Sequence, residues 1–355
     1  MKKILLVCNS VFQIIVASHI AYSKYRGYAV SIILSDYLTE RDKLANAFKK
    51  SGYFDKVYVI SIRQYNRNEI TYNLKEKILY LINSENELKR YVDIKDKYDV
   101  VLVSNINKYT NLLAKTLGNR WRKMEKSNIK VCLYEDGTVS YTKIYEKFLE
   151  KQKEIKKRLD KYYLYAPELC EWKNVNIEKI EKMNSSDGFF ITMLNNLFEF
   201  EVEKEEIKEP IIFFEESYNL NESQVDDLDI LEEICQYIPK ERIAVKLHPR
   251  SEKDRFSPCG YRVLKQSRIP FELYAANYDL SDKVLITIAS GSASNCEIVL
   301  GKSVNTISIY NCLRKYPDIL QNGLKHVIKK IYANYSNMYM PNSLQEVVEK
   351  IQELI

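Results

Sequence analysis

The chain has 355 residues, of which 46% are hydrophobic and 29% charged, so it is long enough for two domains with cores of their own. Its nine glycines and eight prolines are too few for low-complexity linkers, and its hydrophobic content excludes a disordered chain. The net charge of +6 comes from 54 basic and 48 acidic residues, and no basic and aromatic pattern points to nucleic acid.

The first predicted element is a β-strand over residues 4–8, which follows a basic start. Asn9 and Ser10 interrupt its apolar run at once, whereas a secretory signal needs roughly 7–15 apolar residues and a membrane span about 20. We therefore expect a buried strand and a cytoplasmic protein. Seven scattered cysteines without a C-x-x-C pair, and only three histidines, predict reduced core thiols rather than disulfides or a zinc site.

Strand and helix patterns alternate through the first half of the chain. Apolar, β-branched runs predict strands over residues 4–8, 28–34, 56–62, 99–104 and 129–134. Apolar residues at helical spacing predict helices between them, for example over 12–20 and 41–51. Such strands are typical of a parallel sheet covered on both faces. Residues 142–205, rich in Tyr, Lys and charge, are predicted to be helical and to lead into a second domain.

The second half repeats the α/β plan. Strands are predicted over residues 211–214, 242–247, 283–288 and 304–309. Helices are predicted over residues 221–238, 295–300 and from Ser343 onward. We expect two doubly wound domains, residues 1–205 and 206–355, with a terminal helix that is free to pack back on the first domain. Ligands of such domains bind in a cleft at the carboxyl ends of the strands.

Two adjacent carboxylates follow the predicted strand over residues 129–134. They belong to Glu135 and Asp136, and Gly137 next to them releases the turn. One of the two carboxylates could therefore point into a cleft and take a proton from a substrate. An ordinary acidic turn would have the same sequence.

Two further polar segments follow strands of the second half. His248 comes directly after the strand over 242–247, and Pro249 restricts it to extended geometry, although a lone histidine is more often structural. Ser290, Gly291 and Ser292 open a predicted helix. Hydroxyls and free N–H groups at a helix N-terminus can bind an anion, but serine is also a common N-cap.

Taken in order, these segments resemble the motifs shared by bacterial sialyltransferases and polysialyltransferases. The matching residues are Glu135-Asp136-Gly137, His248-Pro249 and Ser290/Ser292. The opening Cys-Asn-Ser-Val-Phe-Gln, residues 8–13, is similar to the start of glycosyltransferase family 52. The segment over 269–272 is similar to the one with which related enzymes place a carboxylate on the donor's ribose. The resemblance extends from residue 1 to about residue 310.

The resemblance implies a GT-B fold, which is two Rossmann-like domains facing a central cleft, and a CMP-sialic acid donor held mainly by the second domain. It implies inversion at the anomeric carbon without a metal ion or cofactor. Asp136 would be the general base, with Glu135 as the alternative, and such help is worth roughly 10²–10⁴-fold. His248 would assist departure of the CMP phosphate as a hydrogen-bond donor or general acid.

The remaining site residues fall into two groups. The residues expected to contact the donor are Lys246, Pro249, Pro270, Glu272, Ser290, Gly291 and Ser292. Those expected on the acceptor side are Asn9, Ser10, Gln13 and Gly137. Lys246 and Glu272 could equally be exposed surface groups. The acidic pair after the strand over 211–214, and the glycine between the two serines, depart from the pattern.

Other interpretations stay open. One is another cytoplasmic GT-B transferase of capsule synthesis that moves glucose or a polyol phosphate. Another is a non-catalytic protein that binds nucleotides or carbohydrates on a degenerate transferase scaffold. The metal-binding letters Asp227-Leu-Asp229 fall within a helical pattern, so we interpret them as a helix surface. Gly301-Lys-Ser303 lacks the first glycine of a P-loop, because Cys296 stands in its place.

The expected partners are a nucleotide-sugar donor and a glycan acceptor, such as capsule polysaccharide or lipooligosaccharide. The sequence leaves open whether the acceptor is lipid-linked and whether the chain forms a homodimer. It also leaves open a peripheral contact between the basic chain and the inner face of the cell membrane.

Overall fold

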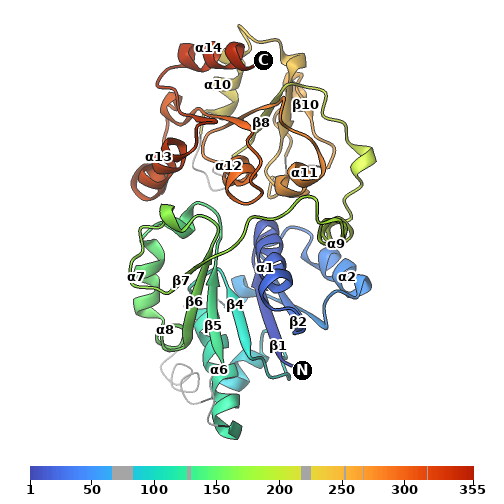
Figure 1. Ribbon diagram of the computed structural model, residues 1–355, viewed down its shortest axis with the longest axis vertical. Coiled ribbons are helices and arrows are strands. Elements are labelled where there is room, and N and C mark those ends of the chain that lie inside the picture. The colour runs from blue at the N-terminus through green and yellow to red at the C-terminus, as the bar shows by residue number, and fades with distance from the viewer. Residues whose placement is uncertain (66–82, 126–128, 217–224, 252, 267, 318) are drawn as a thin grey trace. The chain divides into compact units, whose positions relative to one another are not determined.

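The computed structural model describes residues 1–355 except 66–82, 126–128, 217–224, 252, 267 and 318 (Figure 1). The chain folds into two compact units. Unit 1 comprises residues 1–136, 143–181 and 192–199, and unit 2 comprises residues 137–142, 182–191 and 200–355. The last change from unit 1 to unit 2 thus comes at residue 200, a few residues before the predicted boundary.

The sheet of unit 1 has seven strands in the order β3-β2-β1-β4-β5-β6-β7, and its pairings are parallel. The strands are β1 (Lys3–Cys8), β2 (Ala29–Ser35), β3 (Lys56–Ile60), β4 (Val100–Val103), β5 (Lys130–Tyr134), β6 (Leu159–Leu164) and β7 (Ile177–Lys179). The five predicted strands are all present. Residues 4–8 of the central strand β1 are at most 1% exposed, as expected of a strand covered on both faces.

The prediction of helix throughout residues 142–205 is wrong where the structure has β6 and β7. Tyr162, Tyr163 and Leu164 of β6 are buried, and the hydroxyl of Tyr163 lies 2.8 Å from that of Tyr25. Tyrosine packs well on a sheet surface, whereas the charged residues that suggested a helix lie at the half-buried start of the strand. The edge strand β7 has only three residues, too few for an alternating pattern.

Most helices of unit 1 lie between successive strands in the chain. They are α1 (Val11–Lys24), α2 (Arg41–Ser51), α5 (Ser84–Lys89), α6 (Lys108–Glu125), α7 (Ile144–Lys151) and α8 (Lys153–Arg158), while α9 (Gly188–Phe198) begins in unit 2 and ends in unit 1. Ser10 is the N-cap of α1, since its Oγ accepts the N–H of Gln13 at 3.1 Å. Among the described residues, no helix has both the length and the apolar character to cross a membrane.

The sheet of unit 2 has six parallel strands in the order β10-β9-β8-β11-β12-β13. They are β8 (Ile211–Phe214), β9 (Ile243–Lys246), β10 (Arg262–Val263), β11 (Val284–Thr287), β12 (Asn305–Ser308) and β13 (Met338–Tyr339). The helices are α10 (Asp227–Ile234), α11 (Phe271–Asn277), α12 (Gly291–Ile298), α13 (Lys325–Asn334) and α14 (Leu344–Leu354). The start of the predicted helix over 221–238 lies outside the described residues. The terminal helix α14 packs against α10 within unit 2.

Both sheets reverse their strand order at one place, between β1 and β4 in unit 1 and between β8 and β11 in unit 2. The loops that leave neighbouring strands at such a point run to opposite faces of the sheet, and a crevice opens at the carboxyl ends. The predicted fold class, two doubly wound parallel sheets, is therefore confirmed. The strand ends beside the two reversals are the places to look for a site.

Candidate functional site

Asp136 lies at the end of β5, and three donors hold its carboxylate. Gln13 Nε2 donates to Oδ1 at 2.7 Å, while Asn105 Nδ2 and the Tyr145 hydroxyl donate to Oδ2 at 3.1 and 3.3 Å. The ionised carboxylate is the form that offers lone pairs to all three donors. These donors fix the orientation of the carboxylate, and Asp136 as a residue is half-buried rather than closed off from solvent.

Asn105 connects this carboxylate to the loop after β1. Its Oδ1 accepts from Gln13 Nε2 at 3.2 Å, from Ser104 Oγ at 3.0 Å and from Asn9 Nδ2. Gln13 Oε1 in turn accepts the backbone N–H of Asn9 at 2.6 Å. Gln13 is only 2% exposed, so its amide serves this network. Of the residues predicted on the acceptor side, Gln13 therefore holds Asp136 directly, and Asn9 supports it through Gln13 and Asn105.

The sequence interpretation missed Asn105 and Tyr145. Asn105 directly follows the strand predicted over 99–104, so the signal was the same one that singled out Asn9 after the first strand. An amide without a neighbouring charge draws less attention than a pair of carboxylates. Tyr145 is a buried residue of α7, and nothing in the sequence distinguishes it from the many other tyrosines.

Glu135 points away from Asp136, into the interior of unit 1. It is fully buried, and its Oε2 accepts the backbone N–H of Tyr165 at 2.9 Å. The hydroxyl of Tyr165 lies 2.8 Å from His19 Nδ1, and the two rings stack. Burial raises the pKa of Tyr165 well above its ordinary value, with a further contribution from Glu135. Of the two adjacent acids, only Asp136 is not closed off from solvent.

Gly137 follows with a φ of +70°, in the left-handed region that favours glycine. Apart from its two chain neighbours, no described residue has an atom within 4 Å of the place where a Cβ would lie. The backbone conformation, rather than crowding, is the reason for glycine at this position, and it turns the chain directly after Asp136.

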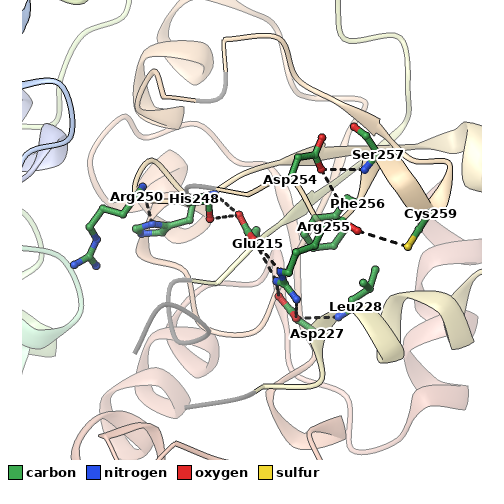
Figure 2. A network of polar contacts seen from close by, with 11 residues as sticks. Glu215, Asp227, Leu228, His248, Arg250, Asp254, Arg255, Phe256, Ser257 and Cys259 are labelled. Carbon is green, nitrogen blue, oxygen red and sulfur yellow. Dashed lines mark hydrogen bonds and ion pairs between the residues drawn. The ribbon is translucent and has the colours of Figure 1, made fainter. Parts of the chain in front are cut away.

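In unit 2, the loop that carries His248 is folded around the carboxylate of Glu215 (Figure 2). Oε2 of Glu215 accepts the backbone N–H of His248 at 3.0 Å and the hydroxyl of Ser251 at 2.5 Å. Oε1 accepts from Nε and a terminal nitrogen of Arg255 at 3.3 and 3.2 Å. The carboxylate is thus fully used in fixing the backbone that presents the histidine.

Arg255 also binds a second buried acid, Asp227, through two hydrogen bonds of 3.1 and 3.0 Å, so the two carboxylates share its charge (Figure 2). The side chain of Asp227 is 0% exposed, so our interpretation of this residue as a helix surface is wrong. A buried carboxylate needs a compensating charge, and Arg255 supplies it from a loop that the helical pattern did not include. Asp229, the other residue of the pair, is exposed.

The ring of His248 has a defined hydrogen-bonding role. Its Nδ1 accepts the backbone N–H of Arg250 at 3.2 Å, so a neutral ring carries its proton on Nε2 (Figure 2). Burial, together with the nearby charges of Arg250 and Lys246, lowers the pKa of His248 to about 3. At neutral pH the imidazole therefore offers an N–H group to a ligand.

The loop before α12 is held by Glu216, the next residue after Glu215. Oε1 of Glu216 accepts the hydroxyl of Thr287 at 3.0 Å and the N–H of Ala289 at 2.9 Å. Thr287 Oγ1 then accepts the N–H of Ser290 at 2.8 Å. Burial raises the pKa of Glu216 to about 7, against the effect of these hydrogen bonds.

Ser290 occupies the N-cap position of α12, but its side chain makes no capping hydrogen bond. Ser10 and Ser343, at the same position of α1 and α14, do make one. The first N–H groups of a helix have no partner within the helix, and both Gly291 and Ser292 lie in this first turn, half-buried. An anion could thus accept from the hydroxyls and from these N–H groups.

Lys246 and Glu272 are both buried, at 3% and 1% exposure, so neither is the exposed surface group that the sequence allowed. Burial lowers the pKa of Lys246 to about 7, although the carboxylates of Glu272, Glu215 and Glu205 oppose this. Burial raises the pKa of Glu272, whose Oε1 accepts from Asn295 Nδ2 at 2.7 Å. Two ionisable groups with perturbed pKa values are thus buried behind the strand ends, as at many functional sites.

The two prolines that were predicted to contact the donor lie at the ends of loops. Pro249, half-buried, follows His248, and Pro270, buried, is the N-cap of α11 with a φ of −62°. Glu272 lies in the first turn of this helix. Within the part of the chain that the structure describes, no three His, Cys, Asp or Glu side chains are grouped to hold a metal ion.

Comparisons with known proteins concern the family and the fold of the chain. The family model described as alpha-2,8-polysialyltransferase matches residues 4–270, well over half of the chain. The structure is similar to an alpha/beta-galactoside alpha-2,3-sialyltransferase of Photobacterium phosphoreum, with a TM-score of 0.53, 14% identity and coverage of 98% of this chain and 100% of that one. A UDP-GlcNAc 2-epimerase of Neisseria meningitidis, solved with UDP-GlcNAc, gives a TM-score of 0.49 at 13% identity, over 99% of this chain and 100% of that one. Among curated proteins, none matches this chain. The predicted GT-B fold is confirmed.

Proposed function

We propose that this chain, which belongs to the alpha-2,8-polysialyltransferase family, transfers sialic acid from CMP-sialic acid to a sugar hydroxyl of a surface glycan, with inversion and without a metal ion. Family membership makes the chain a glycosyltransferase of sialic acid, and the family's donor is CMP-sialic acid. The acceptor, the stereochemistry and the role of each residue are parts of the proposal.

The single observation that carries the proposal is the carboxylate of Asp136, which three donors orient in a residue that is half-buried rather than closed off from solvent. In the proposed reaction Asp136 takes the proton of the acceptor hydroxyl. The oxygen of this hydroxyl attacks the anomeric carbon of the sialic acid, and the bond from that carbon to the CMP phosphate oxygen breaks. The bonding electron pair leaves with CMP. A base placed in this way contributes roughly 10²–10⁴-fold.

Glu135 cannot share this role, because it is fully buried and holds the backbone N–H of Tyr165. We assign it the task of fixing the turn. Gly137 adopts the left-handed conformation that this turn requires. Ser10 caps the start of α1, from which Gln13 reaches the carboxylate of Asp136. An acceptor that meets Asp136 must pass close to the loop after β1, where Asn9 and Ser10 are half-buried.

Unit 2 supplies groups that suit a phosphate leaving group. His248 would donate its Nε2–H, and Ser290 and Ser292 their hydroxyls, to oxygens that gain negative charge as CMP departs. N–H groups in the first turn of α12 would add to this. CMP carries one phosphate, which needs less neutralisation than a pyrophosphate. Donors of this kind therefore support a reaction without a metal ion.

The buried pair of Lys246 and Glu272 suits the nucleoside part of the donor. Glu272 would accept hydrogen bonds from ribose hydroxyls. Lys246, with a pKa of about 7, would exchange its 3.1 Å hydrogen bond to the carbonyl of Leu247 for one to a polar atom of the ligand. Pro249 and Pro270 would hold the two loops in place. Gly291 would let the phosphate approach the backbone.

The acceptor is inferred from the family, whose members are described by alpha-2,8 polysialyl transfer. We propose a sialylated glycan of a capsule or lipooligosaccharide, on which the enzyme builds further sialic acid. Incubation with a short sialylated oligosaccharide and CMP-sialic acid, followed by chromatography, separates a polymer from a single addition.

Binding of nucleotides tests the donor without any acceptor. We expect CMP to bind more tightly than UMP or UDP in calorimetry, in the presence of EDTA. CMP-sialic acid should be turned over, and Asp136→Asn should lower transfer by about 10²-fold or more without weakening CMP binding. Asp229→Asn, the same change on an exposed side chain of α10, is the matched control. Activity with only UDP-glucose or CDP-glycerol would assign the chain to the rival transferases.

A further inference from the structure

We infer that Glu215 and Glu216 are a pair of positioning residues. Together they fix the loop after β9, which carries His248, and the loop after β11, which carries Ser290, relative to each other. The inference rests on the proposed function, in which these two loops hold the phosphate of the donor. It assigns a role to an acidic pair that no donor contact requires. It also explains why two acids can stand beside an anionic ligand.

The place of the pair in the sheet is the first argument. Both residues follow β8, and β8 lies between β9, which leads to His248, and β11, which leads to Ser290. The backbone ladder continues past the end of β8, because the N–H of Glu215 donates to the carbonyl of Lys246 at 3.0 Å. In an extended chain successive side chains point to opposite sides. Adjacent residues can thus serve the two neighbouring loops separately.

The hydrogen bonds follow this division. Among the described residues, the carboxylate of Glu215 accepts hydrogen bonds from groups that follow β9. They are the backbone N–H of His248 and the guanidinium of Arg255, drawn in Figure 2, and the hydroxyl of Ser251. These three residues come from positions 248, 251 and 255, so one carboxylate connects separate parts of the loop after β9.

Glu216 bonds the side of β11. It accepts the Thr287 hydroxyl and the Ala289 N–H, and Thr287 relays the contact to the N–H of Ser290. The N–H groups of residues 289 and 290 are therefore used to hold the loop. Those further along the first turn of α12 are left for a ligand.

Burial shows that both carboxylates act within the protein. Glu215 is 4% exposed and Glu216 is 5% exposed. The charge of Glu215 is compensated by Arg255, and burial raises the pKa of Glu216. Both carboxylates are thus occupied by groups of unit 2 and are closed off from solvent. Each acts through a loop, so neither is a catalytic residue.

Double-mutant cycles on the affinity for CMP distinguish positioning from general stabilisation. Glu216→Leu should weaken CMP binding about tenfold or more in the wild-type background and in His248→Ala. In the Ser290→Ala background the same change should weaken CMP binding much less, because the hydroxyl that Glu216 positions is already absent. The mirror pattern is expected for Glu215→Leu, with the small effect in His248→Ala.

Milder variants cover the case in which these changes unfold unit 2. Thr287→Val removes the relay to Ser290, and Ser251→Ala removes one of the groups that Glu215 holds. Thr287→Val should weaken CMP binding less in the Ser290→Ala background than in wild type, as Glu216→Leu does. Ser251→Ala should weaken it less in the His248→Ala background, as Glu215→Leu does. Glu216→Gln keeps an acceptor oxygen and should bind CMP close to wild type, as should Glu241→Gln, an exposed control.

The outcomes separate this inference from the proposed function. Equal losses of CMP affinity in the His248→Ala and Ser290→Ala backgrounds would overturn the positioning roles and leave the proposed function intact. Wild-type protein that binds no CMP would overturn the proposed function itself, and the premise of the inference with it.

Discussion

Gln13 Nε2 lies 2.7 Å from Asp136 Oδ1, although 123 positions separate the two residues in the chain. Gln13 comes from the first turn of α1, after β1, and Asp136 follows β5. The strand between them in the sheet is β4, and Asn105 after β4 bonds both side chains. The segments that follow three adjacent strands thus all contribute side chains to the same cluster. The orientation of the candidate base is set by the sheet itself.

Gln13→Met tests this orientation. The change keeps the volume of the buried side chain but removes the donor to Oδ1, so we expect kcat to fall by about tenfold to 10²-fold while the KM for CMP-sialic acid changes little. Steady-state kinetics measure both values. Gln64→Met, on an exposed glutamine of unit 1, should leave both unchanged. A rise in KM with an unaltered kcat would mean that Gln13 contacts substrate instead.

Gly291→Ala tests whether the donor phosphate approaches the start of α12. A Cβ at this position would meet Thr138 Oγ1 at 3.8 Å and Asn295 Nδ2 at 3.9 Å, which are ordinary contacts, so the fold should tolerate it. We expect an unchanged melting temperature and CMP affinity that is weaker by about tenfold or more. Gly188→Ala, in open space without a positive φ, is the matched control. CMP affinity equal to wild type would remove Gly291 from the donor site.

The protonation state of His248 can be measured directly. Burial and the charges of Arg250 and Lys246 lower its pKa to about 3, so the ring signal should not titrate between roughly pH 5 and pH 8. Two-dimensional NMR of the imidazole, assigned by its absence in His248→Gln, checks this. The unfolded chain binds the proton at higher pH than the folded one, so this group favours folding above pH 6.5 and that contribution is lost on acidification toward pH 3. A midpoint near pH 6.5 would contradict the neutral donor.

Glu216 makes the opposite prediction for stability. Burial raises its pKa from 4.5 to about 7, so between these values the folded protein keeps a proton that the unfolded chain releases. Its contribution to stability therefore falls as the pH rises through this range. We expect Glu216→Gln to gain unfolding free energy over wild type between about pH 4.5 and pH 8, on the order of 3 kcal/mol. Urea unfolding at the two pH values measures the difference in unfolding free energy between Glu216→Gln and wild type. A difference that is independent of pH would refute the raised pKa of Glu216.

Much of the fold could be predicted from the sequence because buried parallel strands are continuous apolar runs. This held for β1 to β5 and for β8, β9, β11 and β12. It failed for β6, where tyrosines fill the buried positions and charged residues start the strand. Tertiary packing, which a local pattern does not contain, makes that segment a strand.

The candidate site was predictable only in its charged and turn-forming members. Glu135, Asp136 and His248 stood out because they follow predicted strands. The sequence could not show that Glu135 faces the interior, since one residue's shift along a strand reverses its side. Nor could it show that Arg255 compensates Glu215, because that contact spans forty positions and depends on a loop.

The most direct measurement of the central claim is the release of CMP from CMP-sialic acid in the presence of a sialylated oligosaccharide, compared between wild type and Asp136→Asn. We predict that the wild type releases CMP as the oligosaccharide gains sialic acid, and that Asp136→Asn, folded and still able to bind CMP, is slower by about 10²-fold or more. Equal rates for the two proteins, or no release of CMP by the wild type, would contradict the account.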